Sequence, residues 1–174
     1  MGNDWLREEK GFTLVELVLT IVIVMILGTA VSLGLSGLSS ARLDQAVNKV
    51  VSDLRYAQQL AISTQSRHGM TVNSTGQYTI HRDVPPDTAI ANPINLGTTF
   101  VVTFNTYQQG QLAGVVFSSA TPFCGAAGSV MEFNSIGAPT DTNGAVLSCN
   151  STLTLSYGGS TRTITIQKKT GNLT

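Results

Sequence analysis

The sequence predicts an α+β protein in which one long N-terminal helix is followed by an antiparallel β-sheet head. Three observations lead to this class. Residues 12–35 contain a single charged residue and are otherwise apolar, small or hydroxylated. Residues 43–61 place apolar side chains at spacings of three and four, the period of a helix with one apolar face. Beyond Gly69 the chain changes to short runs of β-branched and apolar residues separated by turn residues.

The composition limits the classes of function. The chain has 174 residues, with ten basic and ten acidic side chains. Because these charges cancel, no overall field attracts nucleic acid or an anionic membrane. Only 11% of the residues are charged, against about 25% in an ordinary soluble domain. The length suits one domain with an appended segment.

The uncharged N-terminal stretch predicts a transmembrane helix over residues 12–35. About 20 apolar residues are enough to cross the hydrocarbon core of a bilayer as a helix. A buried helix of a soluble core is one alternative, although such a stretch normally shows an apolar stripe and this one is apolar all round. A cleaved secretory signal is another, although its apolar region is shorter.

Glu16 is the one charge within this stretch. An ionised side chain inside a membrane helix costs roughly 2.5 to 3.5 kcal/mol, so it usually has a function and a partner. The alternative is a carboxylate near the end of the span that reaches the headgroups, where the helix N-terminus also favours negative charge.

The string "GFTLVE", residues 11–16, resembles the processing site of type IV pilins and type II secretion pseudopilins. The resemblance implies that a prepilin peptidase removes residues 1–11 as a leader, cutting between Gly11 and Phe12, and methylates the new amino terminus of Phe12. It also implies that Glu16 is the assembly carboxylate. A glycine lets an active site approach the backbone closely, and a carboxylate in low dielectric gains from the amine of a neighbouring subunit.

The chain departs from this family in two respects. Family leaders are commonly basic, whereas residues 1–10 hold three acids beside two basic residues. The numbers of basic residues on the two sides of the span do not decide its orientation. A cytoplasmic N-terminus follows instead from the resemblance and from the two cysteines of the head, which are discussed below.

The second departure is that the proline that many relatives carry in this helix is missing. Gly28, Gly34 and Gly37 lie there instead, each costing up to about 1 kcal/mol of helix stability. Residues 28–38 are therefore expected to be the weakest part of the helix.

The helix is expected to continue outward to about Ser66, as one element over residues 12–66 that is on the order of 80 Å long. Its apolar stripe would rest on the head domain, residues 67–174. The alternative of an independent coiled coil requires a longer stripe with flanking charge pairs. The predicted stripe consists of Leu43, Val47, Val50, Leu54, Ala57 and Ala61.

The head is expected to be an antiparallel sheet with an irregular, proline-containing loop at residues 83–97. The last two strands should form a hairpin around Gly158 and Gly159, with leucines and isoleucines alternating on one buried face. The predicted strands lie in residues 69–73, 77–83, 98–104, 114–119, 129–137, 144–148, 152–157 and 161–167.

Three stretches resemble the minor branch of the family, which includes the type II secretion "H" subunit and related minor pilins of pili. They are "SDLRYAQQLAISTQ" (52–65), "MEFNSIGAPT" (131–140) and "RTITIQKKTGN" (162–172). The first resembles the end of the family's helix, the second a strand and turn, and the third a closing strand followed by glycine.

Cys124 and Cys149 are the only cysteines. An even pair in an exported chain predicts a disulfide, which for a loop of about 25 residues would stabilise the fold by roughly 3 kcal/mol in the chain-entropy model. Two buried thiols are an alternative. A metal site is another, with only His68 and His81 as imidazole ligands.

The sequence carries no enzymatic motif, so neither catalysis nor a cofactor is expected. It lacks a nucleophile elbow, a phosphate-binding glycine loop and a paired-carboxylate motif. Residues 141–144 start like a calcium loop but lack its downstream glutamate, and a turn is the better interpretation.

These observations predict a minor pilin or pseudopilin with a structural role in assembly or secretion, held in the bacterial inner membrane with a periplasmic head. Its expected partners are other pilin subunits, the prepilin peptidase and the inner-membrane assembly platform. The competing class is a DNA-binding minor pilin for DNA uptake. The arginines that such a tail would carry are missing, and only Lys168 and Lys169 could contact phosphates. A third class is a membrane-tethered enzyme or binding module that keeps its leader.

Overall fold

A computed structural model describes residues 11–82, 88–118, 124 and 129–174, and within residues 29–38 it describes the backbone only. The expected leader residues 1–10, together with Pro85 and Pro86, lie outside the described residues. The chain divides into two compact units, Met1–Leu38 and Ser39–Thr174, which are described separately.

One helix, α1 (Leu14–Thr64), supplies residues to both units. It is assigned as continuous helix across the glycine-containing stretch 28–38. Gln65 follows in the left-handed conformation with φ of 52°, as the residue after a helix often does. Within the described ranges, no helical stretch combines the length and the hydropathy that crossing a membrane requires.

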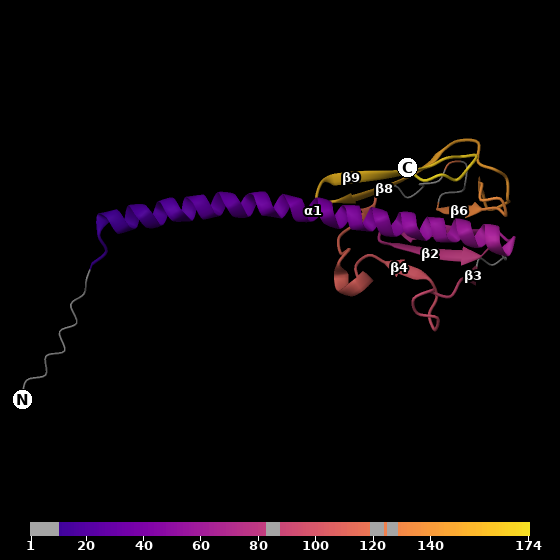
Figure 1. The fold of residues 1–174 in the computed structure, drawn as a ribbon, viewed down its shortest axis with the longest axis horizontal. Helices are drawn as coiled ribbons and strands as arrows, with labels where there is room; N and C mark the ends of the chain where they lie inside the picture. The colour runs from indigo at the N-terminus through magenta and orange to yellow at the C-terminus, as the bar shows by residue number, and fades with distance from the viewer. Residues whose placement is uncertain (1–10, 83–87, 119–123, 125–128) are drawn as a thin grey trace, which may run out of the picture. The chain divides into compact units, whose positions relative to one another are not determined.

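The Ser39–Thr174 unit contains two antiparallel sheets (Figure 1). The first has the order β3-β2-β1-β6-β7, with β4 also paired to β2, and the second has the order β5-β8-β9. Together with α1 they confirm the predicted α+β class. The strands are β1 (His68–Ser74), β2 (Gln77–Arg82), β3 (Thr88–Ala89), β4 (Val101–Thr103), β5 (Val116–Phe117), β6 (Val130–Phe133), β7 (Pro139–Thr140), β8 (Ser151–Tyr157) and β9 (Ser160–Ile166), with one 3₁₀ turn, η1 (Tyr107–Gly110).

The β8–β9 hairpin forms where the sequence predicts it. Tyr157 pairs with Ser160, and the two glycines between them have φ of 56° and 83°. Two consecutive positive φ values suit the right-handed twist of a two-residue hairpin turn. The predicted buried face is confirmed, since its four side chains are at most 2% exposed: Leu153, Leu155, Ile164 and Ile166.

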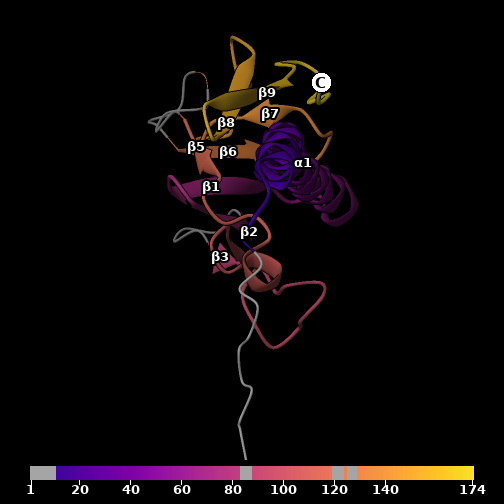
Figure 2. The same ribbon diagram turned by 90° about the vertical axis from the view of Figure 1, so that its left-hand side faces the viewer.

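The core lies between the second half of α1 and the strands, which Figure 2 shows on one side of the helix. Five of the six predicted stripe residues are completely buried, and Val47 is half-buried while its neighbour Ala46 is completely buried. On the sheet side, Tyr78, Phe104 and Phe117 pack their rings with centroids 5.2 to 6.1 Å apart. These separations are typical of favourable aromatic pairs.

The strand predicted over residues 144–148 is wrong. Only one isolated bridge, Thr140 with Val146, forms there. The reason is local: the Asp141 carboxylate accepts hydrogen bonds from the backbone of Asn143 at 2.9 Å and of Ala145 at 2.8 Å. These bonds curl the chain into a turn, as expected for residues 141–144, and leave too few residues for a strand.

Candidate processing and assembly site

The predicted processing residues lie just before α1. Residues 11–13 are not helical, and the helix begins at Leu14. A Cβ placed on Gly11 would have nothing within 4 Å, and Phe12 is 75% exposed. The backbone between Gly11 and Phe12 is therefore open to an approaching active site.

Glu16 lies in the first turn of α1 and is exposed. Its backbone N–H donates to the Thr13 hydroxyl at 3.2 Å, and the backbone N–H of Leu17 donates to the Thr13 carbonyl at 3.1 Å. Thr13 is thus the N-cap residue, and Glu16 has the third helical position of a Thr-x-x-Glu capping pattern. The sequence reasoning missed this role, although the spacing of Thr13 and Glu16 was visible.

The capping geometry gives the carboxylate a local stabilising role. Negative charge in the first turn interacts favourably with the unpaired N–H groups and the dipole of the helix. The apolar side chains on both sides of Glu16 in the sequence are exposed, and five of them line an open groove of about 370 Å³: Leu14, Val15, Val18, Leu19 and Val22. The site therefore combines an accessible backbone, one acid and an apolar helix surface.

A buried polar cluster joins α1 to the sheet inside the head. Lys49 Nζ lies 2.6 Å from both carboxylate oxygens of Asp53, and the Tyr78 hydroxyl donates to Asp53 Oδ2 at 2.6 Å. Burial, and then the Asp53 carboxylate, raise the pKa of Tyr78 well above its ordinary value. Lys49 also lies over the rings of Phe100 and Tyr107, 5.2 and 5.4 Å from their centroids. The sequence reasoning missed this cluster; the four-residue spacing of Lys49 and Asp53 on a helix was its signal.

The three stretches that resemble the minor branch meet at one point. Gln58 of α1 donates from Nε2 to the carbonyl of Gly137 at 2.8 Å and to that of Thr170 at 3.2 Å. Gly171, with φ of 66°, packs so closely that a Cβ there would lie 2.5 Å from Gln58 Nε2 and from the Gly137 carbonyl oxygen. One side chain thus connects the helix, the turn after β6 and the segment after β9.

Cys124 and Cys149 form the predicted disulfide, with Cα atoms 5.9 Å apart. The backbone N–H of Cys124 also donates to the Ser151 hydroxyl at 3.0 Å. Because both sulfur atoms are in this bond, the two cysteines are neither free thiols nor metal ligands. Across the described ranges, no three metal-ligating side chains gather.

The two histidines are buried, with His68 4% and His81 2% exposed.

An ion pair lies near the start of β1. Arg67 Nη1 lies 3.3 Å from Glu132 Oε2 and donates to the Thr142 carbonyl at 3.3 Å. Glu132 is fully buried, and no sequence pattern indicated this. The arginine ties the Asp141 turn to β6.

The two lysines considered for DNA differ in their surroundings. Lys168 is half-buried, and its Nζ donates to the Ser148 carbonyl at 2.9 Å. Lys169 is exposed. The two lysines are therefore not equivalent, because Lys169 is exposed whereas the Lys168 ammonium already donates to a backbone carbonyl.

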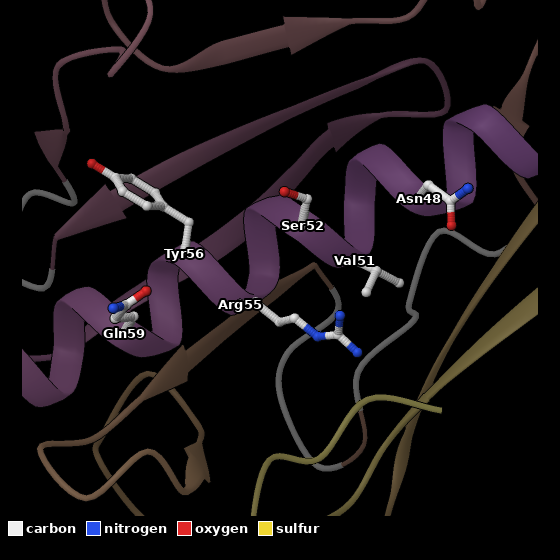
Figure 3. Close-up of a pocket in the computed structure, with 6 residues that line it drawn as sticks. All are labelled: Asn48, Val51, Ser52, Arg55, Tyr56 and Gln59. Atoms are coloured by element: carbon white, nitrogen blue, oxygen red, sulfur yellow. The ribbon is translucent and has the colours of Figure 1, made fainter.

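The outward face of α1 in the head carries a shallow groove of about 380 Å³ (Figure 3). Tyr56 and Ser52 point to one side of the helix, and Val51 and Arg55 to the other. A second hollow of about 260 Å³ continues from it and shares Tyr56 and Gln59. Its remaining walls are Leu60 and Ser63.

The comparisons with known proteins agree with this arrangement. A family model for the prokaryotic N-terminal methylation motif matches residues 6–32. The crystal structure of the type IV minor pilin FimU from Pseudomonas aeruginosa strain PAO1 is similar, with a TM-score of 0.50, 13% sequence identity and coverage of 78% of this chain and 88% of that chain. A search of curated proteins found no match. The chain thus contains the N-terminal methylation motif and shares its fold with a minor pilin.

Proposed function

We propose that this protein is a minor pilin or pseudopilin subunit that is processed between Gly11 and Phe12 and incorporated into a type IV pilus or a type II secretion pseudopilus. The observation that carries the proposal is the match of residues 6–32 to the methylation motif. Within it, residues 11–13 are not helical, and α1 begins at Leu14 with Thr13 as its cap. The similarity in fold to a minor pilin, over 78% of this chain, supports it.

Processing would create a positively charged amino terminus on Phe12, four residues before Glu16. Hydrolysis of the Gly11–Phe12 peptide bond leaves a carboxylate on Gly11 and an amine on Phe12, which the peptidase then methylates. The amine stays cationic, and in low dielectric it attracts the Glu16 carboxylate of a neighbouring subunit. This attraction offsets part of the cost of a carboxylate within the membrane.

The proposal includes an inner-membrane anchor in residues 12–35 and a periplasmic head from residue 67 onward. The almost uncharged N-terminal stretch supports the anchor, and the disulfide supports an oxidising compartment for the head. The expected partners are other pilin subunits, the peptidase and the assembly platform. The role in either machine is structural rather than enzymatic, in priming assembly or in passing motion to cargo.

The DNA-binding alternative has less support. Phosphate contacts need free cationic groups, whereas the ammonium of Lys168 is bound to the Ser148 carbonyl. Gel shifts of the protein over a salt series test this alternative. Binding at physiological salt that is lost in Lys168→Ala, Lys169→Ala protein would favour it.

The decisive experiment is mass analysis of the N-terminus of the native protein. A chain that begins with methylated Phe12 is the expected result. A chain that keeps residues 1–11 would refute the proposal and favour a tethered enzyme or binding module. Gly11→Val protein is the matched control, because its bulkier side chain should block cleavage while leaving the helix unchanged.

A further inference from the structure

The head begins close to the end of the predicted membrane span. That span ends at residue 35, and the Ser39–Thr174 unit begins four residues later. Four residues reach at most about 14 Å even when fully extended, and the headgroup layer of a bilayer is roughly 5 to 8 Å thick on each side. If residues 12–35 span the bilayer as proposed, the chain itself holds Ser39 within or just above the headgroups, whatever direction the helix takes.

The turn between β8 and β9 lies at the same end of the head. A Cβ placed on Gly158 would lie 3.7 Å from the Cβ of Ser39, and Figure 1 shows this hairpin beside α1. Gly158 and Gly159 are both exposed, and a Cβ on Gly159 would meet nothing within 4 Å. The turn is therefore accessible and is held next to the first residue of the head.

Arg42, one helical turn after Ser39, is fixed against this hairpin. Its Nη1 atom donates to the Tyr157 hydroxyl at 2.9 Å and to the Ala113 carbonyl at 3.1 Å. Its guanidinium carbon lies 5.1 Å from the centroid of the Tyr157 ring. Because both acceptors are uncharged, these bonds orient the guanidinium without neutralising its charge.

The arginine on the hairpin itself is paired with an acid. Arg162 Nε lies 2.9 Å from Asp44 Oδ1, and the two side chains are 45% and 52% exposed. This pair is neutral, so within the described part of the chain the excess charge at this end of the head comes from Arg42.

These groups suit the headgroup layer of a bilayer. Tyrosine is enriched at membrane–water interfaces, because its ring is apolar and its hydroxyl is polar. A guanidinium binds phosphate through N–H donors of fixed direction. Phospholipids present phosphate at the depth to which the chain confines Ser39.

We propose that the Arg42–Tyr157 face, formed by these two residues and the Gly158–Gly159 turn, rests on the phospholipid headgroups of the bilayer that holds the anchor, with Arg42 binding lipid phosphate. The inference rests on the anchor of the proposed function and adds an orientation of the head before assembly. The contact is broken when the subunit leaves the membrane for a filament.

The test uses the full-length protein in nanodiscs of phosphatidylcholine and phosphatidylglycerol, with one chain in each disc and the native disulfide oxidised. A nitroxide label is attached at Thr161→Cys, just after the turn, or at Ile136→Cys as the control; both sites are exposed. Ile136 precedes Gly137, whose Cβ would lie 3.0 Å from Ile62 Cδ1. Along α1 the distance from Ser39 to Ile62 is about 35 Å, so the control reports on the far end of the head.

A nickel-chelating lipid in the disc relaxes nitroxides that lie near the headgroups. The expected result is a loss of microwave saturation for the label at residue 161 and none for the label at residue 136. Equal relaxation of the two labels, or stronger relaxation at residue 136, would overturn the inference. Relaxation at residue 161 that appears only when a disc holds two chains would assign the face to a second copy and would overturn it as well.

A charge change tests Arg42 directly. Arg42→Gln should lower the ratio of relaxed to unrelaxed labels at residue 161 by about fivefold, the effect of one cation at an anionic surface. Arg55→Gln is the matched control, because it removes the same charge from an exposed site about 20 Å farther along α1, beyond the Debye length of about 8 Å. Equal effects of the two changes would contradict the role of Arg42. Near-ultraviolet circular dichroism checks the fold of both variants, and the labels in otherwise native protein test the docking without them.

Failure of this inference can be told apart from failure of the proposed function. Protein that does not float with the discs would refute the membrane anchor and the inference together. Protein that floats with them, but whose residue 161 is no closer to the lipid than residue 136, would refute the inference alone. N-terminal mass analysis would then still decide the proposed function.

Discussion

Replacing Gly171 by alanine should destabilise the head far more than an equivalent change at another left-handed glycine. The residue has φ of 66°, where a side chain costs about 1 to 2 kcal/mol. The new Cβ would lie 2.5 Å from Gln58 Nε2 and from the Gly137 carbonyl oxygen. Gln58 would have to move away from the carbonyls of Gly137 and Thr170, which it binds at 2.8 and 3.2 Å.

The magnitude follows from these parts. Each hydrogen bond that Gln58 loses costs about 0.5 to 1.5 kcal/mol. Alanine also reduces the freedom of the unfolded chain, which returns about 0.4 to 1 kcal/mol. Gly171→Ala should therefore lower the free energy of unfolding by about 1 to 4.5 kcal/mol.

Gly159→Ala is the matched control. Gly159 has φ of 83°, but a Cβ there would meet nothing within 4 Å. It should therefore lose only the backbone contribution, about 0 to 1.5 kcal/mol after the gain from the unfolded chain. The assay is urea unfolding of the oxidised protein in detergent, followed by near-ultraviolet circular dichroism of the head.

Equal midpoints for Gly171→Ala and Gly159→Ala would refute the reasoning, because the steric contribution would then be absent. A double-mutant cycle sharpens the test. In a Gln58→Ala background the clash with Nε2 no longer exists, so Gly171→Ala should cost less than in the native background. Additive costs would show that the two residues do not interact.

Three further changes have defined outcomes. Tyr78→Phe should lower the free energy of unfolding by about 1.5 to 3 kcal/mol, because the buried Asp53 carboxylate loses the hydrogen bond that the Tyr78 hydroxyl donates to it. Since the folded pKa of Tyr78 is raised above its unfolded value near 10, the native protein should lose stability as the pH rises above about 10, and Tyr78→Phe protein should not show this component in unfolding measured across alkaline pH. Thr13→Val should remove the cap, at a cost of about 0.5 to 2 kcal/mol, and speed amide hydrogen exchange at Glu16, whereas Thr13→Ser should keep the native rate; equal rates in both variants would contradict the capping role. Cys149→Ser should lower the free energy of unfolding by roughly 3 kcal/mol, and an unchanged urea midpoint under oxidising conditions would count against a stabilising disulfide.

Much of the fold could be predicted because its signals are local. The stripe from Leu43 to Ala61 repeats with the helical period, so the buried face of α1 follows from the sequence. The one difference is that Ala46 is completely buried and Val47, which was predicted in the stripe, is half-buried. The β8–β9 hairpin follows from Gly158 and Gly159, because few other residues accept two positive φ values in succession. The motif at residues 11–16 could also be recognised, since its six residues are consecutive in the sequence.

The sequence by itself thus determined the helix, the class of fold, the disulfide partners and the processing motif. Only the tertiary structure decided which polar groups are buried together. Asp53 meets Tyr78 across 25 positions, and Gln58 meets Gly137 and Thr170 across 79 and 112 positions. Such contacts depend on how the helix and the sheets pack. A one-residue change of strand register, for example, would move the Tyr78 side chain to the opposite face of its sheet. Local periodicity specifies which face an element buries, whereas the partners on that face come from the packing of elements that are distant in the chain.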